Sequence, residues 1–365
     1  MIATAHQRSP LAADLDHILD HTQGLWEGLR GQAIFITGGT GFFGRWLLES
    51  FAEANHRFSL GAQAVVLTRN PEGFRKQADQ LASDEFIQLV KGDVQTLDAE
   101  TVQSQLGSAA PEHFSHFIHA ASETTETANR HDPTRVLETS VIGTRRALDF
   151  ATRMGTENFL LTSSGAVYGV QPHDLSHLPE TYSGAPDIGA PLSAYGEGKR
   201  VAELLCNARR QSGAMNCKIA RCFAFVGPHL ALDAHYAIGN FIRDALAGKQ
   251  IQVNGDGTPV RSYLYAADLA IWLWTILLNP AASGTYNVGS DEAHAIREIA
   301  KYVSQNSATQ PPVKVAQTPN PNFPATRYVP DICRAQSELG LQVWTPLHTA
   351  IRKTLEFHYQ PRNFI

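Results

Sequence analysis

The chain alternates short, almost wholly apolar runs with longer segments whose apolar positions recur at helical spacing. Five such runs stand between residues 31 and 165, and they read QAIFITGG, AQAVVLTRN, EFIQLVKGDV, FSHFIHAAS and ENFLLTSS. Helical patterns such as FFGRWLLESFAEA and PTRVLETSVIGTRRALDFATRMG lie between them. Strands that alternate with helices form a parallel sheet buried on both faces, which accounts for their continuous apolar character. The pattern therefore predicts an α/β protein with a doubly wound parallel sheet.

The same pattern divides the chain into three parts. Residues 1–30 are polar but carry apolar residues at helical spacing, which predicts a helical extension that packs against the body or a partner. Residues 31–183 hold the alternating strands and helices. Residues 184–365 begin with a helix and continue with returning strands and a smaller C-terminal lobe. The join is GVQPHDLSHLPETYSGAPDIGAPLS, a long loop rich in Pro, Gly and Ser, and loops of this length usually carry function.

Composition removes several classes of partner. The 365 residues carry a net charge of -5, and the sequence pI is about 6.3, so neither nucleic acid nor an anionic membrane is expected to bind. The most apolar run, LAIWLWTILL at residues 269–278, is too short to span a bilayer and predicts a buried helix. No signal sequence precedes the body, and we expect a cytoplasmic protein.

No metal site or disulfide framework is expected either. The four cysteines form no CxxC pair, which favours reduced thiols. His113, His116 and His119 are spaced by three, but residues three apart on a strand face opposite sides.

The segment ITGGTGFFGRW carries Gly38, Gly41 and Gly44 between the first strand and the first helix. Glycine permits positive φ and lets backbone N–H groups approach a pyrophosphate, while the helix N-terminus adds a favourable dipole. A turn that serves packing only is the alternative. In this strand–turn–helix context the segment predicts a dinucleotide site, in which Phe42 and Phe43 begin the helix, and makes residues 31–183 the dinucleotide-binding domain.

Residues at the ends of the next two strands are expected to contact the adenosine of the dinucleotide. An acidic residue after the second strand would bind a 2′-hydroxyl, whereas Arg69 suits a 2′-phosphate, which favours NADP over NAD. Stacking of Arg69 on adenine is the alternative and suits either cofactor. Asp93, followed by Val94, ends the third strand and is either an acceptor for the adenine amino group or a simple loop carboxylate.

The segment SAYGEGK places Tyr195 and Lys199 four residues apart, on one face of a helix. A free phenol titrates near pH ~10, which is too high for efficient proton transfer at neutral pH, and a neighbouring cation stabilises the phenolate. The spacing is consistent with a proton-transfer pair or with an ordinary surface pair.

Five motifs occur in order, TGGTGFFG, FIHAAS, LTSSGAVYG, SAYGEGK and RCFAFVGP, and the tail TRYVPDICRAQSELG follows them. With these motifs the chain resembles an extended short-chain dehydrogenase/reductase of the NAD-dependent epimerase/dehydratase family over residues 31–358. The resemblance implies a Rossmann fold, a nicotinamide cofactor, a nucleotide-diphosphate sugar as substrate, and a homodimer. It also implies a role in polysaccharide or glycoconjugate synthesis.

The resemblance assigns the catalytic set. Tyr195 resembles the catalytic tyrosine, and Lys199 together with the nicotinamide ring would stabilise its phenolate. Ser164 would hydrogen-bond the oxygen whose carbon exchanges hydride, although a serine that caps the strand end is the alternative. Ala120 and Ala121 would lie against the cofactor.

The residues after Ser164 bear on the reaction. Dehydratases of the family carry an acidic pair there, and decarboxylases commonly carry a Glu, whereas this chain has Gly165 and Ala166. The resemblance therefore favours a 4-epimerase, with an NADPH-dependent 4-ketoreductase as the alternative that Arg69 supports. Glu123 is expected to accept a sugar hydroxyl, and as a substitute base it would revive dehydration or decarboxylation. A non-catalytic NADP(H) sensor would not need the complete set.

The resemblance also marks the second lobe. Asn240 and Arg261 occupy positions that meet the nucleotide diphosphate in the family, and an arginine fork suits that anion. A structural ion pair between Arg261 and Asp268 is the alternative. Ala224 replaces an asparagine that the family often shows, so the substrate is expected to sit differently from a common hexose.

Overall fold

The computed structural model of the chain describes residues 10–123, 126–190, 192–234, 236–320, 322 and 324–359. The first nine residues of the predicted extension lie outside this set.

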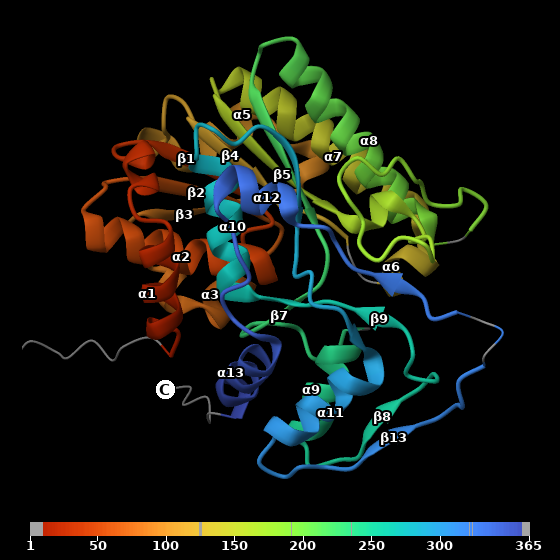
Figure 1. Cartoon of the computed structure of the whole chain (residues 1–365). Helices are drawn as coiled ribbons and strands as arrows, with labels where there is room; N and C mark the ends of the chain where they lie inside the picture. Colours follow the sequence, from red (N-terminus) through yellow and green to blue (C-terminus); the bar gives the residue numbers. More distant parts are fainter. Residues whose placement is uncertain are drawn as a thin grey trace, which may run out of the picture.

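A seven-stranded sheet forms the centre of the larger part of the molecule (Figure 1). Every neighbouring pair of strands is parallel, in the order β11-β6-β5-β4-β1-β2-β3. The strands are β1 (Ala33–Thr37), β2 (Gln63–Thr68), β3 (Ile87–Lys91), β4 (His116–His119), β5 (Asn158–Ser164), β6 (Asn216–Cys222) and β11 (Gly284–Val288). The strand order reverses between β1 and β4, and ligands bind at such a reversal in doubly wound sheets. The predicted Rossmann-type α/β fold is confirmed.

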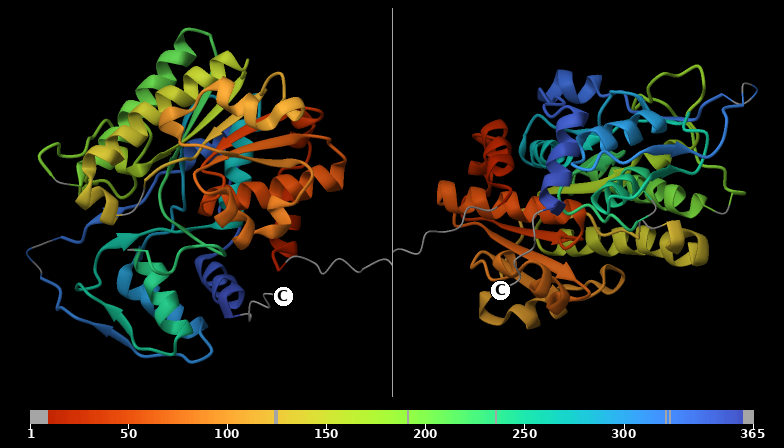
Figure 2. Two further views of the ribbon diagram at one scale, coloured as in Figure 1. Left: turned by 180° about the vertical axis from the view of Figure 1, so that it is seen from behind. Right: turned by 90° about the horizontal axis from the view of Figure 1, so that it is seen from below.

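Helices cover both faces of the sheet (Figure 2). One face packs against α2 (Phe42–Phe58) and α10 (Ala266–Leu278), and the other against α5 (Ala99–Leu106), α7 (Pro133–Arg153) and α8 (Ser193–Gln211). Alternation along the strands supplies both cores, because Ile34 and Ile36 of β1 join the first cluster and Phe35 joins the second. The apolar run at residues 269–278 is the buried helix α10 that its pattern predicts. In the described part of the chain, no helix has both the length and the apolarity to cross a bilayer.

Polar caps fix where the helices near the sheet edge begin. Asn70 caps α3 (Pro71–Gln77) by accepting a hydrogen bond from the Gly73 N–H at 2.9 Å. Asp132 caps α7 in the same way, with Pro133 at the first helical position. Short elements on this side are α4 (Asp79–Ala82), α6 (Glu126–His131) and the 3₁₀ turns η2 (Val94–Thr96), η3 (Gly107–Ala109) and η4 (Gly165–Tyr168).

A smaller lobe lies below the sheet in Figure 1 and is built from α9 (Ala237–Leu246), α11 (Ile296–Asn306) and α13 (Leu347–Tyr359). Its short strands are β8 (Ile251–Val253), which pairs with β13 (Val313–Val315), and β9 (Val260–Arg261), which pairs with β12 (His294–Ala295) and β14 (Arg327–Tyr328). The pair β7 (Phe225–Val226) and β10 (Leu264–Tyr265) joins the two parts, and α12 (Cys333–Leu339) packs beside β11. Residues 169–190 form the expected long loop, in which Leu178 bridges to Pro330.

The helical spacing near the N-terminus corresponds to α1 (Ala12–His21), which is followed by the 3₁₀ turn η1 (Leu25–Leu29). The Asp14 carboxylate of α1 accepts a hydrogen bond from the Tyr265 hydroxyl at 2.8 Å and pairs with the Lys353 ammonium of α13. The His17 ring lies 3.1 Å from the Asp268 carboxylate at the start of α10. Thus α1 ties the sheet domain to the last helix of the smaller lobe.

Candidate active site

The turn between β1 and α2, residues 38–41, is rich in glycine and exposes its backbone, and it is called the glycine cradle below. Gly38 has φ +73°, and a Cβ there would lie 2.4 Å from the Ala120 carbonyl carbon after β4. At Gly44 a Cβ would lie 2.3 Å from the Gly39 Cα, so the first turn of α2 packs directly on the loop. Gly41 is the N-cap of α2. Backbone N–H groups at a helix N-terminus, with no side chain between them and a ligand, fit the pyrophosphate of a dinucleotide.

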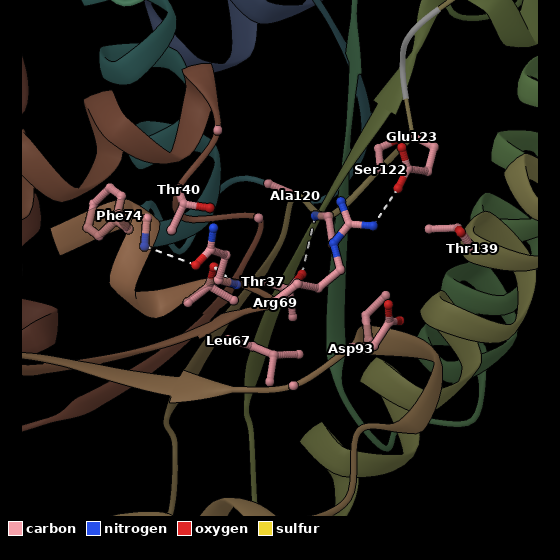
Figure 3. Close-up of a pocket in the computed structure, with 18 of the residues that line it drawn as sticks. Thr37, Thr40, Leu67, Arg69, Phe74, Asp93, Ala120, Ser122, Glu123 and Thr139 are labelled. Carbon is pink, nitrogen blue, oxygen red and sulfur yellow. Dashed lines mark hydrogen bonds and ion pairs between the residues drawn. The ribbon is translucent and has the colours of Figure 1, made fainter. Parts of the chain in front are cut away.

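A cavity of about 340 Å³ opens over this turn (Figure 3). Seven of the predicted cofactor residues line it, namely Gly38, Gly41, Arg69, Asp93, Val94, Ala120 and Ala121. Phe42, Phe43 and Gly44 do not, because Phe43 packs on Phe225 at 5.0 Å between ring centroids and Gly44 faces the turn. The Asp93 carboxylate accepts a hydrogen bond from the Gln95 N–H at 2.9 Å, so it serves the loop as well as the cavity.

An ion pair spans the rim of this cavity. The Arg69 guanidinium lies 2.7 Å from the Glu123 carboxylate, and Figure 3 shows the arginine extended toward it. Arg135 of α7 approaches the same carboxylate at 3.6 Å. Glu123, expected at the sugar, is therefore engaged at the cofactor cavity, and Arg69, expected at a 2′-phosphate, already has an anionic partner.

The three predicted catalytic residues come together from two elements. Ser164 ends β5, and Tyr195 and Lys199 lie one turn apart in the first turns of α8. The Ser164 hydroxyl hydrogen-bonds the Tyr195 phenol, and it also accepts the Ala166 N–H at 3.1 Å, so it caps η4 as well. The Lys199 ammonium donates to the Thr162 carbonyl at 2.8 Å and lies 6.0 Å from the centroid of the Tyr195 ring.

The protein's own groups alone do not lower the pKa of the Tyr195 phenol. Burial raises the pKa of Tyr195 to about 12, and the neighbouring Ser164 hydroxyl offsets only part of that rise. Burial lowers the pKa of Lys199 to about 8, and its ammonium is directed at the Thr162 carbonyl rather than at the phenol hydroxyl. The sequence prediction also included the nicotinamide cation, which would supply the remaining stabilisation of the phenolate when it is bound.

A second phenol completes the site, and sequence reasoning missed it. Tyr328 of β14 hydrogen-bonds the Ser164 hydroxyl and stacks on Phe223 at 4.6 Å between ring centroids. A Cβ at Gly165 would lie 2.5 Å from the Tyr328 hydroxyl, so the phenol fills the space that a side chain at residue 165 would need. Burial raises the pKa of Tyr328, which keeps its hydroxyl protonated at neutral pH. Its only sequence signal was the tail motif TRYVPDICRAQSELG, which contains it.

Behind the catalytic residues lies a buried ion pair that was also missed. Glu203, one turn after Lys199 on α8, accepts the Ser163 hydroxyl at 2.6 Å. Its two carboxylate oxygens receive the Arg221 guanidinium of β6 at 2.7 and 3.0 Å. The helix that carries the catalytic pair is thereby fixed to two strands of the sheet.

The second-lobe residues have separate positions. Arg261 of β9 pairs in register with Tyr328, within electrostatic reach of its phenol. The alternative of an ion pair between Arg261 and Asp268 is wrong, since Asp268 is held by α1 and the chain near α13. Asn240 accepts a hydrogen bond from Arg243 at 2.9 Å and lies one turn after Tyr236, whose phenol acts electrostatically on the catalytic tyrosine.

Comparison with known proteins identifies a family and a shared fold. The sequence profile of the NAD dependent epimerase/dehydratase family matches residues 34–289. UDP-glucuronic acid decarboxylase 1 of Xenopus tropicalis is 29% identical over 325 residues, which are 89% of this chain and 71% of the relative. The UDP-glucose 4-epimerase of Thermus thermophilus, solved with NAD, has a TM-score of 0.72 at 23% identity and covers 89% of this chain and 98% of its own. The dTDP-glucose 4,6-dehydratase of Streptomyces venezuelae, also solved with NAD, has a TM-score of 0.74 at 21% identity, with coverage of 91% and 98%.

Proposed function

The chain belongs to the NAD-dependent epimerase/dehydratase family, and we propose that it is a nucleotide-sugar epimerase that acts through a transient 4-keto sugar. The proposal rests on the Ser164, Tyr195 and Lys199 group beside the dinucleotide cavity. The sequence relatives and the fold neighbours are named as enzymes of nucleotide sugars, which supports this substrate class.

Each residue has a part that follows from its contacts. Tyr195 takes the proton from the sugar 4-hydroxyl and later returns it. Ser164, which bonds the phenol, donates to the same sugar oxygen as the carbonyl forms. Lys199, fixed by the Thr162 carbonyl, keeps a cation beside the phenol. A bound nicotinamide would supply the hydride acceptor and donor, which no side chain can replace.

The observation that favours the epimerase over a dehydratase is the space beside Ser164. Elimination of a C6 hydroxyl needs a carboxylate to remove the C5 proton, and Gly165 and Ala166 offer none. Tyr328 fills that space with a phenol whose pKa is raised by burial, and the position holds no carboxylate. Oxidation and reduction at C4 need only the three catalytic residues.

A UDP-glucuronate decarboxylase is the second candidate, and the sequence relatives favour it. Once C4 of a uronic acid is a ketone, the carboxylate belongs to a β-keto acid, which loses CO₂ without a base that removes a proton. Arg261 would suit either a diphosphate or a carboxylate. Among the described residues no carboxylate forms an ion pair with it, so its charge is available to a substrate anion.

The dinucleotide is the third part of the proposal. The family is NAD-dependent, and the glycine cradle fits either dinucleotide. The expectation of NADP depends on Arg69, and a 2′-phosphate would have to replace its Glu123 partner. We therefore propose NAD as the resident cofactor, with NADP as the alternative that Arg69 leaves open. Dissociation constants for NADH and NADPH, measured by their fluorescence on the purified protein, decide between them.

We propose a homodimer formed through α7 and α8, which pack side by side. Their outer surfaces expose Leu137, Ile142 and Leu204, the last to 67%. Leu204→Glu should halve the mass measured by light scattering, and an unchanged mass would reject this surface. The cysteines of the described chain are free thiols, which suits the cytoplasm that we propose as its compartment.

One experiment separates the two reactions. The purified protein is incubated with UDP-glucose, UDP-N-acetylglucosamine or UDP-glucuronate, with and without added NADH or NADPH, and the products are followed by NMR. Interconversion of 4-epimers without added reductant supports the epimerase, and release of CO₂ from UDP-glucuronate supports the decarboxylase. Tyr195→Phe should abolish either reaction while the dissociation constant for NADH stays close to that of the wild type. An unaffected rate would remove Tyr195 from the mechanism.

A further inference from the structure

The ion pair between Arg69 and Glu123 lies across the dinucleotide cavity rather than beside it. Arg69 directly follows β2, and Glu123 follows β4 by four residues. In the sheet β1 lies between these strands, and the glycine turn begins where β1 ends. A side-chain bridge from the end of β2 to the end of β4 therefore crosses the mouth of the cradle (Figure 3).

Both ends of the bridge are held by the fold. Asn70, the residue after Arg69, caps α3, which fixes the backbone that presents the arginine. The Glu123 side chain is only 18% exposed, and it receives Arg135 of α7 as well as Arg69. An ordinary surface pair contributes little, but a shared and largely buried carboxylate keeps its position. The arginine, at 60% exposure, is the end that can swing away.

We propose that Arg69 and Glu123 form a clasp that closes over the bound dinucleotide, slows its release, and makes Glu123 the residue that favours NAD over NADP. A dinucleotide on the glycine turn would cross the switch point between β1 and β4, and the proposal places it beneath the bridge. The cofactor leaves only when the arginine lets go of the carboxylate. While the pair is closed, the guanidinium is not available to a 2′-phosphate, and the carboxylate repels one.

Slow release suits the proposed reaction, on which this inference depends for its dinucleotide. An epimerase returns the cofactor to its starting state in every turnover, so a retained molecule serves many cycles. A reductase has to exchange its cofactor each time, and a clasp would limit its rate.

The test measures cofactor release directly. Protein loaded with NADH is mixed with excess NAD, and the loss of bound NADH fluorescence gives the dissociation rate for the wild type, Glu123→Gln, Arg69→Gln and the double variant. Each single variant should release NADH about three to ten times faster, and the double variant no faster than the singles, because the contact between Arg69 and Glu123 is lost in all three. Glu72→Gln is the matched control, since Glu72 pairs with Arg75 on the outside of α3, away from the cavity lining, and its release rate should stay unchanged.

Two further readouts identify the mechanism. Salt should accelerate release from the wild type and not from Glu123→Gln, because ions screen an exposed pair. NADPH should bind several-fold more tightly to Glu123→Gln than to the wild type, because the variant frees Arg69 for the 2′-phosphate.

The possible failures are distinguishable. If Glu123→Gln binds NADH and melts at the wild-type temperature but releases it at the wild-type rate, the clasp is overturned and the proposed function stands. Tighter NADPH binding without faster NADH release would also overturn the clasp. A wild-type protein that binds neither dinucleotide would overturn the clasp and the proposed function together.

Discussion

Replacing Glu203 by Gln tests whether the buried pair behind the active site holds the catalytic helix in place. The Glu203 side chain is 7% exposed and that of Arg221 is 17% exposed, and the carboxylate also accepts the Ser163 hydroxyl. Glutamine keeps the shape but removes the charge, which leaves a largely buried guanidinium without its anion. Breaking a buried ion pair from one side costs about 3–5 kcal/mol, a large part of the ~5–15 kcal/mol that stabilises an ordinary domain.

The assay is urea unfolding followed by circular dichroism, with Glu356→Gln as the control. Glu356 pairs with Arg352 at 3.7 Å on α13, and both side chains are more than half exposed, so its loss should cost less than about 1 kcal/mol. Replacing Arg221 by Met in the Glu203→Gln chain should recover part of the loss, because no buried charge then remains unpaired.

Activity provides an independent readout of the same change. The Glu203 carboxylate raises the pKa of Lys199, which burial lowers to about 8. Without that carboxylate the lysine should lose its proton at a lower pH, so the alkaline limb of kcat against pH should move to lower pH. If Glu203→Gln unfolds no earlier than Glu356→Gln and its alkaline limb is unmoved, the pair neither holds α8 nor acts on Lys199.

Three other predictions concern separate parts of the molecule. Gly165→Ala should lower kcat/KM about tenfold or more, because its Cβ meets the Tyr328 hydroxyl, and Tyr328→Phe in the same chain should restore part of the rate. Burial lowers the pKa of His116 to about 4 and of His119 to about 3, so the unfolded chain takes up protons first as pH falls below 6.5. Each histidine should then lower the free energy of unfolding by about 3 kcal/mol as the pH falls from 6.5 to 4. Over that range the melting temperature of His116→Gln should fall less steeply than that of the wild type. Asp14→Ala should lower the melting temperature, because the Tyr265 hydroxyl and the Lys353 ammonium lose their shared partner. Leaving a buried polar group without its partner costs about 1–3 kcal/mol of folding free energy. A melting curve like that of the wild type would contradict this.

The sheet was predictable because burial on two faces imposes a local and repeated pattern. Every apolar run that was expected to be a strand became one, and the glycine turn took the backbone form that its residue types require. The catalytic three were assigned from the family motifs LTSSGAVYG and SAYGEGK, and their placement follows local rules, since Tyr195 and Lys199 are one helical turn apart and Ser164 ends a predicted strand. The spacing of residues along one helix and the last residue of a strand are local features, and they do not depend on contacts between distant parts of the chain.

What escaped prediction depends on contacts between distant parts of the chain. Tyr328 reaches Ser164 only because β14 pairs with β9 in the smaller lobe, and no local pattern encodes that pairing. The partner of Arg69 is set by the separation of two strand ends across the sheet. The burial that raises the pKa of Tyr195 and the direction of the Lys199 ammonium were not predictable, because helical spacing gives only the distance between the two residues.

The bridge that Asp14 makes from α1 has a consequence for how the molecule is assembled. Its two partners follow it by 251 and 339 residues, so α1 leaves the ribosome long before either exists. Part of α1 can contact α2 early, but the two Asp14 contacts cannot form until β10 and α13 have been synthesised, and closing so long a loop is entropically slow. We therefore expect the Asp14 bridge to close late in biogenesis, after both lobes have been synthesised.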